Sequence, residues 1–359
     1  MAEVPTIRWG IVATGMISSW FVEDLVLDRP DAPVKHIIQA IGSSALEKGQ
    51  SFVSKYCPNS TPTIYASYEE VYNDPSVDII YIGTPHAFHK RNCLDAIAAG
   101  KPVLCEKSFT INAAEAKEVF KAAADRNVYV HEAMWLRHRP LVHNLRKLLF
   151  EKKIIGDVFR SYIDFGMEVD IPSLPSTSRY KDLALGAGSL LDIGLYSLTW
   201  AMLTLDAGMP GNSEKPKVQA SQTHLHGVEV TSSILLEYPS TGRHGIALST
   251  TMGPGHPNCF GRVSGTGGYV ELEGVQPSHP VSFTVFRKDE NGEIPVKGET
   301  FDFPRVGRGF IYEADNTALD VLAGRKENAL VPWSETIRVM ELMDEIRRQG
   351  GTVYPVDRV

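Results

Sequence analysis

The chain has 359 residues, of which 43% are hydrophobic and 22% charged, and its formal net charge is -7. This length predicts two domains, and the composition is that of a globular protein with a sizeable core. The acidic balance argues against nucleic acid or an anionic membrane as a partner, because both favour basic patches. The four cysteines show neither metal-ligand spacing nor a disulfide pattern, so we expect no metal and a reducing, cytoplasmic compartment. We recognise no secretory signal and no apolar run of membrane-spanning length.

The first stretch, residues 7–21, reads I-R-W-G-I-V-A-T-G-M-I-S-S-W-F. An apolar run followed by apolar residues at four-residue spacing predicts a buried parallel strand, a glycine turn and a helix. This arrangement binds the pyrophosphate of a dinucleotide over the backbone N–H groups that begin the helix. Only the middle glycine of the G-x-G-x-x-G fingerprint is present, so a simple tight turn is the alternative. The candidate cofactor contacts in this turn are Ala13, Thr14, Gly15, Met16 and Ile17.

The strand predicted over 34–42 is followed by two hydroxyl side chains, Ser43 and Ser44. NAD-binding sites usually place an acidic residue here for the ribose 2′-OH, and this chain has none. With Lys48 one helical turn further on, the two hydroxyls indicate a 2′-phosphate site, and therefore NADP rather than NAD. The alternative is that Ser44 only caps the helix predicted over 45–56.

The alternation of strands and helices continues to residue 131, with N-cap patterns at Ser67 and Asn112. Four further strands are predicted over 63–65, 77–83, 102–106 and 128–131. Six strands alternating with helices predict an α/β Rossmann domain, a doubly wound parallel sheet, over residues 1–137. An open parallel sheet binds its ligand at the carboxyl ends of the strands. The candidate cofactor residues there are Thr84, Pro85, His86, His89, Glu106 and Lys107. For the two histidines, a helix cap and a packed surface residue are the alternatives.

Beyond residue 137 the pattern changes. A helix over 141–152, a strand over 158–165 and a polar loop over 168–185 precede an apolar helix that runs to about residue 205. Several short strands without intervening helices then imply an antiparallel sheet. Two helices, over 312–322 and 333–349, end the chain. We expect an α+β domain over residues 138–359 with a large, mainly antiparallel open sheet and with its last helices packing back towards the first domain.

Four stretches together resemble one family: W-G-I-V-A-T-G-M-I-S, T-P-H-A-F-H, C-E-K-S and L-L-D-I-G-L-Y. They are similar to the glucose-fructose oxidoreductase and inositol dehydrogenase superfamily. With E-A-M-W at residues 132–135, they look closest to its dimeric dihydrodiol dehydrogenases and fungal NADP-dependent D-xylose 1-dehydrogenases. The E-K-P of the family is E-K-S here, so we expect a slightly looser loop after the lysine. The alanine within G-A-G at 186–188 is expected to limit how closely backbone or substrate approaches.

The resemblance implies that Lys107 and Tyr196 are catalytic, that Asp192, Arg179 and Trp135 bind substrate, and that the C-terminal sheet forms a homodimer. Oxidising an alcohol requires a base, and a phenol of pKa near 10 is handicapped at pH 7 by roughly 4 kcal/mol. A nearby lysine ammonium offsets part of this. Asp192, one helical turn before Tyr196, can hold a substrate hydroxyl and would be charge-compensated by Lys107. For Arg179, an ordinary surface position is the alternative.

The preferred function is an NADP-dependent dehydrogenase that acts on CH–OH groups, either an aldose at its anomeric carbon or a cyclic trans-diol. The first alternative is a tailoring reductase of a biosynthetic pathway that acts on another carbonyl or imine, because the same residues would serve it. The second is a non-catalytic NADP-binding sensor. A sensor needs neither Lys107 nor Tyr196, so their presence favours an enzyme.

Overall fold

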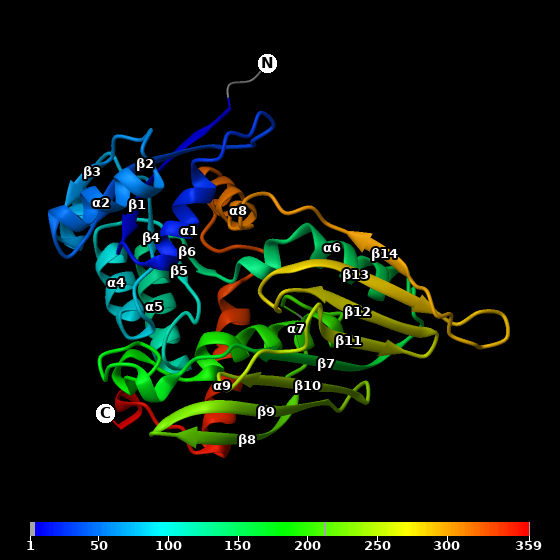
Figure 1. The fold of residues 1–359 in the computed structure, drawn as a ribbon. Helices are drawn as coiled ribbons and strands as arrows, with labels where there is room; N and C mark the ends of the chain where they lie inside the picture. The colour runs from blue at the N-terminus through cyan, green and yellow to red at the C-terminus, as the bar shows by residue number, and fades with distance from the viewer. Residues whose placement is uncertain (1–3, 212, 359) are drawn as a thin grey trace. The chain divides into compact units, whose positions relative to one another are not determined.

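The computed structural model describes residues 4–211 and 213–358 (Figure 1). Within them the chain forms two compact units. The first comprises the chain up to His138 together with Arg305–Ile337, and the second comprises Arg139–Pro304 together with the chain from Arg338 onwards.

The first unit contains a six-stranded sheet in the order β3-β2-β1-β4-β5-β6, and every pair in it is parallel. Its strands are β1 (Thr6–Val12), β2 (Lys35–Gly42), β3 (Thr63–Tyr65), β4 (Ile79–Ile82), β5 (Val103–Glu106) and β6 (Val130–Ala133). The order reverses between β1 and β4, which is the point where an open α/β sheet binds its ligand. The predicted doubly wound sheet is confirmed.

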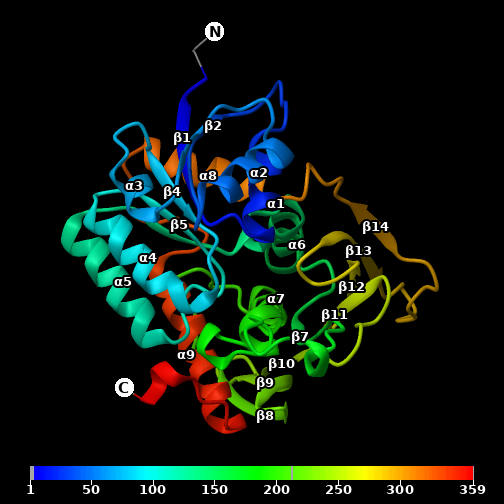
Figure 2. The ribbon, with the colours of Figure 1, turned by 60° about the vertical axis from the view of Figure 1, so that its left-hand side comes forward.

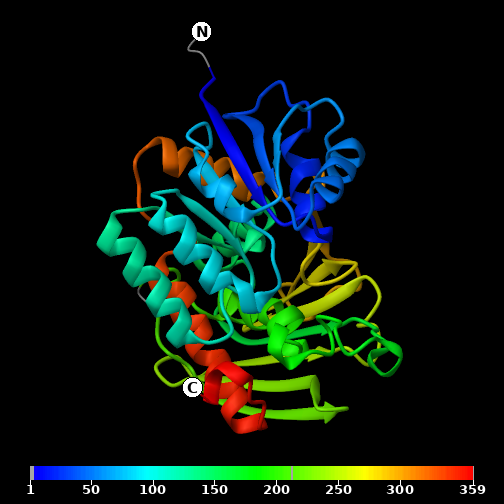
Figure 3. The ribbon, with the colours of Figure 1, turned by 90° about the vertical axis from the view of Figure 1, so that its left-hand side faces the viewer.

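Helices cover this sheet, and they begin and end close to their predicted limits. They are α1 (Met16–Leu25), α2 (Leu46–Tyr56), α3 (Tyr68–Asn73), α4 (His86–Ala98), α5 (Ala113–Arg126) and α8 (Ile311–Leu322). Figures 2 and 3 show α4 and α5 side by side along the sheet. The two predicted N-caps are present: Ser67 Oγ accepts the N–H of Glu70, and Asn112 Oδ1 accepts the N–H of Glu115. Local side-chain chemistry therefore sets where these two helices begin.

The second unit contains an eight-stranded sheet in the order β14-β13-β12-β11-β7-β10-β9-β8. Its strands are β7 (Val158–Gly166), β8 (Lys217–Leu225), β9 (Val228–Tyr238), β10 (Arg243–Thr250), β11 (Cys259–Gly265), β12 (Gly268–Gly274), β13 (Pro280–Arg287) and β14 (Glu299–Asp302). The mainly antiparallel sheet is confirmed, with one exception: β7 and β10 are parallel. Parallel neighbours need a crossover connection, and here the chain passes through helix α7 (Leu195–Leu205) and the β8–β9 hairpin between them.

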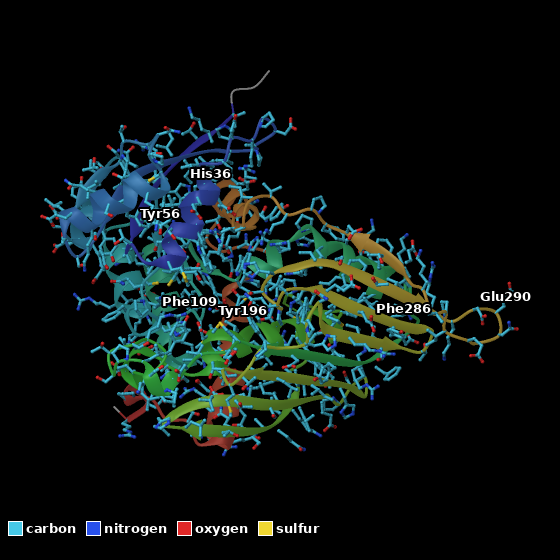
Figure 4. All side chains as sticks on the ribbon, in the orientation of Figure 1. His36, Tyr56, Phe109, Tyr196, Phe286 and Glu290 are labelled. Atoms are coloured by element: carbon cyan, nitrogen blue, oxygen red, sulfur yellow. The ribbon has the colours of Figure 1, made fainter. Side chains whose placement is uncertain are left out.

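Other helical segments complete this part of the chain. Helix α6 (Pro140–Arg146) continues as a π-helical turn over Lys147–Glu151, where one longer helix was predicted. Helix α9 (Trp333–Gly350) begins in the first unit and belongs to the second from Arg338 onwards. The loop between β13 and β14 projects from the sheet with Glu290 near its tip (Figure 4).

The segment Leu183–Leu205 is long and apolar enough to span a membrane by length and composition, which corrects the expectation that no run reaches that length. Every residue of α7, which ends this segment, is buried. The helix packs against β7 and β10 of its own unit. Burial in the core of the second unit therefore accounts for its apolar composition.

Candidate active site

The turn between β1 and α1 has the geometry that a pyrophosphate requires. Gly15 is the N-cap of α1, with φ -81° and ψ -179°, and the first turn of the helix carries no acidic residue. A Cβ atom added to Gly15 would meet no atom within 4 Å, so packing against the described chain does not explain the glycine. Ala13 adopts a left-handed φ of 78°, at the position where the fingerprint has its first glycine. The open space and the exposed N–H groups of the helix start fit a dinucleotide.

The third glycine of the fingerprint allows the helix to pack closely on the sheet, and serine occupies its position here. Ser18 is completely buried. A Cβ atom added to Gly83, directly after β4, would lie 2.3 Å from Ser18 Oγ and 3.3 Å from Ile17 Cγ2. The close contact between helix and sheet is therefore made by a glycine on the neighbouring strand, which a sequence pattern around α1 cannot reveal.

We expect Gly83→Ala to lower the free energy of unfolding by about 1–3 kcal/mol, because the new methyl group overlaps Ser18 Oγ. In the double variant with Ser18→Gly, much of this stability should be recovered. The single variant Ser18→Gly should lose about 1 kcal/mol of unfolding free energy, because glycine is unfavourable within a helix. Urea unfolding of the two single variants and the double variant measures the coupling. Strictly additive effects would contradict the proposed contact.

The candidate ribose site follows β2. Ser43 is 1% exposed and its Oγ lies 3.2 Å from Thr14 Oγ1, which joins the glycine turn to the end of β2. Ser44 accepts a hydrogen bond of 3.0 Å from Lys48 Nζ at the surface. The N-cap of α2 is Ala45, without a side-chain capping bond, so Ser44 does not cap this helix. Ser44 and Lys48 thus form a polar surface pair next to the first turn of α2.

His89 connects the ends of two neighbouring strands. It is wholly buried, with Nε2 2.7 Å from the carbonyl oxygen of Thr84 and Nδ1 3.0 Å from that of Ser108. It is therefore not a surface histidine, which was the alternative to a cofactor contact. Burial lowers the pKa of His89, and the two carbonyl groups act in the opposite direction. His86, with 6% of its surface exposed, lies edge-on to the His89 ring, directly after Pro85.

Lys107 follows the last residue of β5, and buried side chains hold the backbone on both sides of it: Glu106 at its own N–H and His89 at the next residue, Ser108. The Glu106 carboxylate accepts the Lys107 N–H at 3.2 Å and the Tyr81 hydroxyl at 2.8 Å. The next peptide bond, between Lys107 and Ser108, is cis. Burial raises the pKa of Glu106 to about 7. Through Glu106 on one side and the His89–Ser108 contact on the other, the loop is held although it lacks the family's proline.

Trp135 lies in the core of the first unit. It is 3% exposed, and its ring stacks on Phe310 with the centroids 4.5 Å apart. This burial leaves little of the indole available for contact with a substrate.

The second unit carries the other predicted site residues. Tyr196 is the second residue of α7 (Figure 4), it is 4% exposed, and its ring centroid lies 6.0 Å from that of Phe165. Asp192 lies in the π-helical turn Leu190–Gly194 that runs into α7. Both residues therefore belong to one continuous helical segment, as predicted.

Arg179 forms an ion pair with Asp192 through Nη1 at 3.1 Å and Nη2 at 3.4 Å. Arg179 is therefore one charge partner of Asp192, and the expected compensation by Lys107 stays a prediction. Arg179 also donates to the Tyr180 hydroxyl at 2.8 Å and lies over its ring. Burial lowers the pKa of Arg179, but Asp192 and Tyr180 raise it by more, so the guanidinium stays charged near neutrality. The Arg179 side chain is 38% exposed, so this ion pair lies at the surface of its unit and the substrate role of Arg179 stays a prediction.

Two supporting residues were missed by the sequence analysis: Tyr180 and Glu229. Glu229, on β9, is 1% exposed and accepts the Ser189 hydroxyl at 2.6 Å and the Leu190 N–H at 2.8 Å. It thereby caps the helical segment that carries Asp192. A Cβ atom at Gly188 would lie 3.1 Å from Glu229 Oε2, so this glycine serves packing. The available signal was an acidic residue between two valines, at positions 228 and 230.

Residues 7–134 match the family model described as "Oxidoreductase family, NAD-binding Rossmann fold". The chain is 33% identical to the D-xylose 1-dehydrogenase (NADP(+)) of Hypocrea jecorina, over 98% of this chain and 93% of that protein. It is 35% identical to the trans-1,2-dihydrobenzene-1,2-diol dehydrogenase of Xenopus laevis, over 97% of this chain and 99% of that protein. A solved 3-ketoreductase from Actinomadura kijaniata, in complex with NADP and TDP-benzene, shares the fold with a TM-score of 0.78 and 21% identity, over 96% of this chain and 98% of that one.

The fold and the glycine turn define a nicotinamide-dependent oxidoreductase with a dinucleotide-binding domain. The chain belongs to the NAD-binding Rossmann-fold oxidoreductase family that its four motifs resemble. The predicted family and enzyme class are thereby confirmed.

Proposed function

We propose that this oxidoreductase is an NADP-dependent dehydrogenase whose substrate is a sugar or a cyclic trans-diol. The observation that carries this proposal is the ion pair between Arg179, in the preceding loop, and Asp192, which lies on the same helical segment as Tyr196. A carboxylate accepts and a guanidinium donates hydrogen bonds, so together they suit neighbouring hydroxyl groups on one ring. The names of the two relatives, a xylose dehydrogenase and a dihydrodiol dehydrogenase, point to substrates of this kind.

In this proposal the first unit binds the dinucleotide and the second binds the substrate. The nicotinamide ring, when bound, accepts or donates the hydride. Tyr196 exchanges the proton of the substrate hydroxyl, and the Lys107 ammonium stabilises the negative charge that develops as this proton leaves. Asp192 and Arg179 orient the substrate. Trp135, which is buried, is proposed to support the substrate site indirectly, by packing within its own unit.

The remaining cofactor contacts are proposed from their positions around the glycine turn and the strand ends. Ala13, Thr14, Gly15, Met16 and Ile17 would hold the pyrophosphate, and Thr84, Pro85, His86 and His89 would flank the nicotinamide. Ser43, Ser44 and Lys48 would bind the 2′-phosphate, because hydroxyl groups and an ammonium suit a phosphate and no acidic residue stands directly after β2, at positions 43 and 44.

Lys48→Ala should raise the KM for NADP about ten-fold, which corresponds to about 1.4 kcal/mol of lost phosphate binding. The KM for NAD should stay within about two-fold, because NAD has no 2′-phosphate. Lys55→Ala, at the other end of α2, is the matched control and should change neither constant. Equal effects of Lys48→Ala on both cofactors would contradict a phosphate contact.

The substrate is tested by following NADPH absorbance with D-xylose, D-glucose and trans-1,2-dihydrobenzene-1,2-diol. We expect turnover with NADP and at least one of them. If none is oxidised although NADPH binds, the proposed substrate class is wrong. The tailoring reductase would then be tested with carbonyl substrates, and the sensor only if these also fail.

We also infer a cytosolic homodimer that associates through the outer face of the eight-stranded sheet. Tyr162 and Leu235 are 41% and 51% exposed on this face, so it presents large apolar side chains to solvent. Near Tyr162 the face has a hollow of about 270 Å³, lined by Arg160, Tyr162, Ile246, Arg262 and Ser264. Light scattering should give twice the mass of 39.6 kDa, and a monomer would refute the dimer.

A further inference from the structure

A buried acidic residue on α8, Glu313, has no side-chain hydrogen bond within the described residues. Glu313 is 0% exposed, and neither of its carboxyl oxygens has a hydrogen-bond partner within the described residues. Glu106, Asp24 and Glu132 lie within electrostatic reach of it in the same unit. Burial, and then repulsion by these acids, raises the pKa of Glu313 well above its ordinary value. Burial without a hydrogen-bond donor among the described residues therefore favours the uncharged form of Glu313.

Glu106 has the opposite surroundings, because two donors point at it. Tyr81 donates its hydroxyl to Oε1, and Lys107 donates its backbone N–H to Oε2. Tyr81 is held in place by a parallel stack on Phe21, with ring centroids 3.9 Å apart. Burial and the nearby Glu106 raise the pKa of Tyr81 well above 10, so this phenol remains a donor. Two donors stabilise the ionised form of Glu106 against the cost of its burial.

Other titratable groups face Glu106 from every neighbouring element. Directly after β5, the ammonium of Lys107 favours ionisation of Glu106. On β5 itself, burial raises the pKa of the Cys105 thiol, which therefore stays neutral. Glu132 on β6 opposes ionisation of Glu106, and Tyr81 on β4 favours it. Glu313 on α8 adds no charge while it is protonated. The net result is a Glu106 pKa of about 7, so this carboxyl changes charge close to neutral pH.

We propose that Glu106 is a positioning residue. Its ionised carboxylate is oriented by Tyr81 and lies near Glu313, which is uncharged and does not repel it, and this carboxylate fixes the backbone of Lys107. A protonated carboxyl has an O–H of its own and accepts less well from the two donors, so the contact with the Lys107 N–H weakens when Glu106 gains a proton. The direction in which the Lys107 side chain leaves β5 then becomes less fixed. The functional importance of this device rests on the proposed catalytic role of Lys107.

The test follows the backbone amide of Lys107 by NMR in the full chain, labelled with ¹⁵N at lysine and free of substrate and cofactor. Loss of the signal in Lys107→Arg assigns it. We expect the amide shift to titrate with a midpoint near pH 7, as Glu106 does, and to stay flat in Glu106→Gln. Tyr81→Phe should raise the midpoint by about half a unit or more, because it removes one donor from the carboxylate.

Tyr72→Phe is the matched control, because it also removes a buried phenol hydroxyl of the first unit, one without a partner in the described residues. Its midpoint should equal that of the unmodified chain. Glu313→Gln should also leave the midpoint unchanged, since a protonated carboxyl and an amide are both uncharged. A lower midpoint in Glu313→Gln would show that Glu313 is ionised. A Lys107 amide that does not titrate, or equal midpoints in Tyr81→Phe and Tyr72→Phe, would overturn the proposal.

Turnover provides the second readout. Tyr81→Phe should lower kcat several-fold at pH 7 and much less at pH 9, where Glu106 is ionised in both chains, with KM little changed. A merely structural defect would lower kcat at both values. The NMR titration needs no substrate, so it distinguishes failure of this inference from failure of the proposed substrate class.

Discussion

Tyr196→Phe should lower kcat by about 10²- to 10⁴-fold, the usual contribution of a positioned general acid or base. The substitution removes one oxygen atom and keeps the ring that packs near Phe165 in a buried helix. The fold and the dinucleotide turn of the other unit should therefore be unaffected, and the affinity for NADPH should stay within about two-fold. Steady-state kinetics and a fluorescence titration with NADPH measure the two quantities.

Thr199→Val is the matched control for this experiment. Thr199 lies on the same helix, and its buried hydroxyl has no hydrogen-bond partner in the described part of the chain. Replacing such a hydroxyl by a methyl group is close to neutral, so kcat should remain within about two-fold. If Tyr196→Phe loses cofactor affinity together with turnover, or if it retains full turnover, the acid–base role is wrong.

Lys107→Met should lower kcat by about 10²- to 10³-fold, because it removes a charge placed where negative charge develops in the transition state. Methionine keeps the unbranched, flexible shape of the lysine side chain. Lys107→Arg should recover only part of the activity, since the planar guanidinium places its donors differently from an ammonium. Initial rates at saturating NADP compare the three chains.

Lys121→Met provides the control, since Lys121 pairs with Asp125 on the exposed side of α5. Its kcat should not change. Nearly normal turnover in Lys107→Met would remove this residue from the mechanism and leave the substrate question untouched. Loss of cofactor binding without a change in kcat at saturation would assign Lys107 to the dinucleotide alone.

The sequence was most informative where local chemistry decides the structure. The N-caps at Ser67 and Asn112 depend on a hydrogen bond to a residue three positions away, and both are present. The alternation of strands and helices predicted the parallel sheet, and with it the strand end that carries Lys107. These signals lie within a few residues of the feature that they predict.

Contacts between distant segments could not be predicted in this way. The pairing of Asp192 with Arg179 depends on the path of a loop that has no periodic pattern. The parallel neighbours β7 and β10 are separated by a helix and a hairpin. The run of short strands therefore predicted a mainly antiparallel sheet and did not predict this one parallel pair. A glutamate in the first turn of a helix is usually exposed, and only the packing of α8 shows that Glu313 is buried.

Composition alone also failed to separate two environments that favour the same residues. The segment that ends in α7 is apolar because protein surrounds it, and lipid would select a similar composition. A sequence window measures hydropathy and does not record what covers a helix.

The contact between Gly83 and Ser18 has a consequence for how such chains are found. The packing needs a small residue in at least one of the two contacting positions. The requirement for a small residue therefore belongs to positions 18 and 83 together, which are 65 residues apart. A Cβ atom at position 83 also lies 3.0 Å from Tyr81 Cε1, so glycine at position 18 alone does not make full room for a larger residue at position 83. The glycine that this helix–sheet contact needs can therefore stand outside the fingerprint, where a linear motif around α1 does not record it.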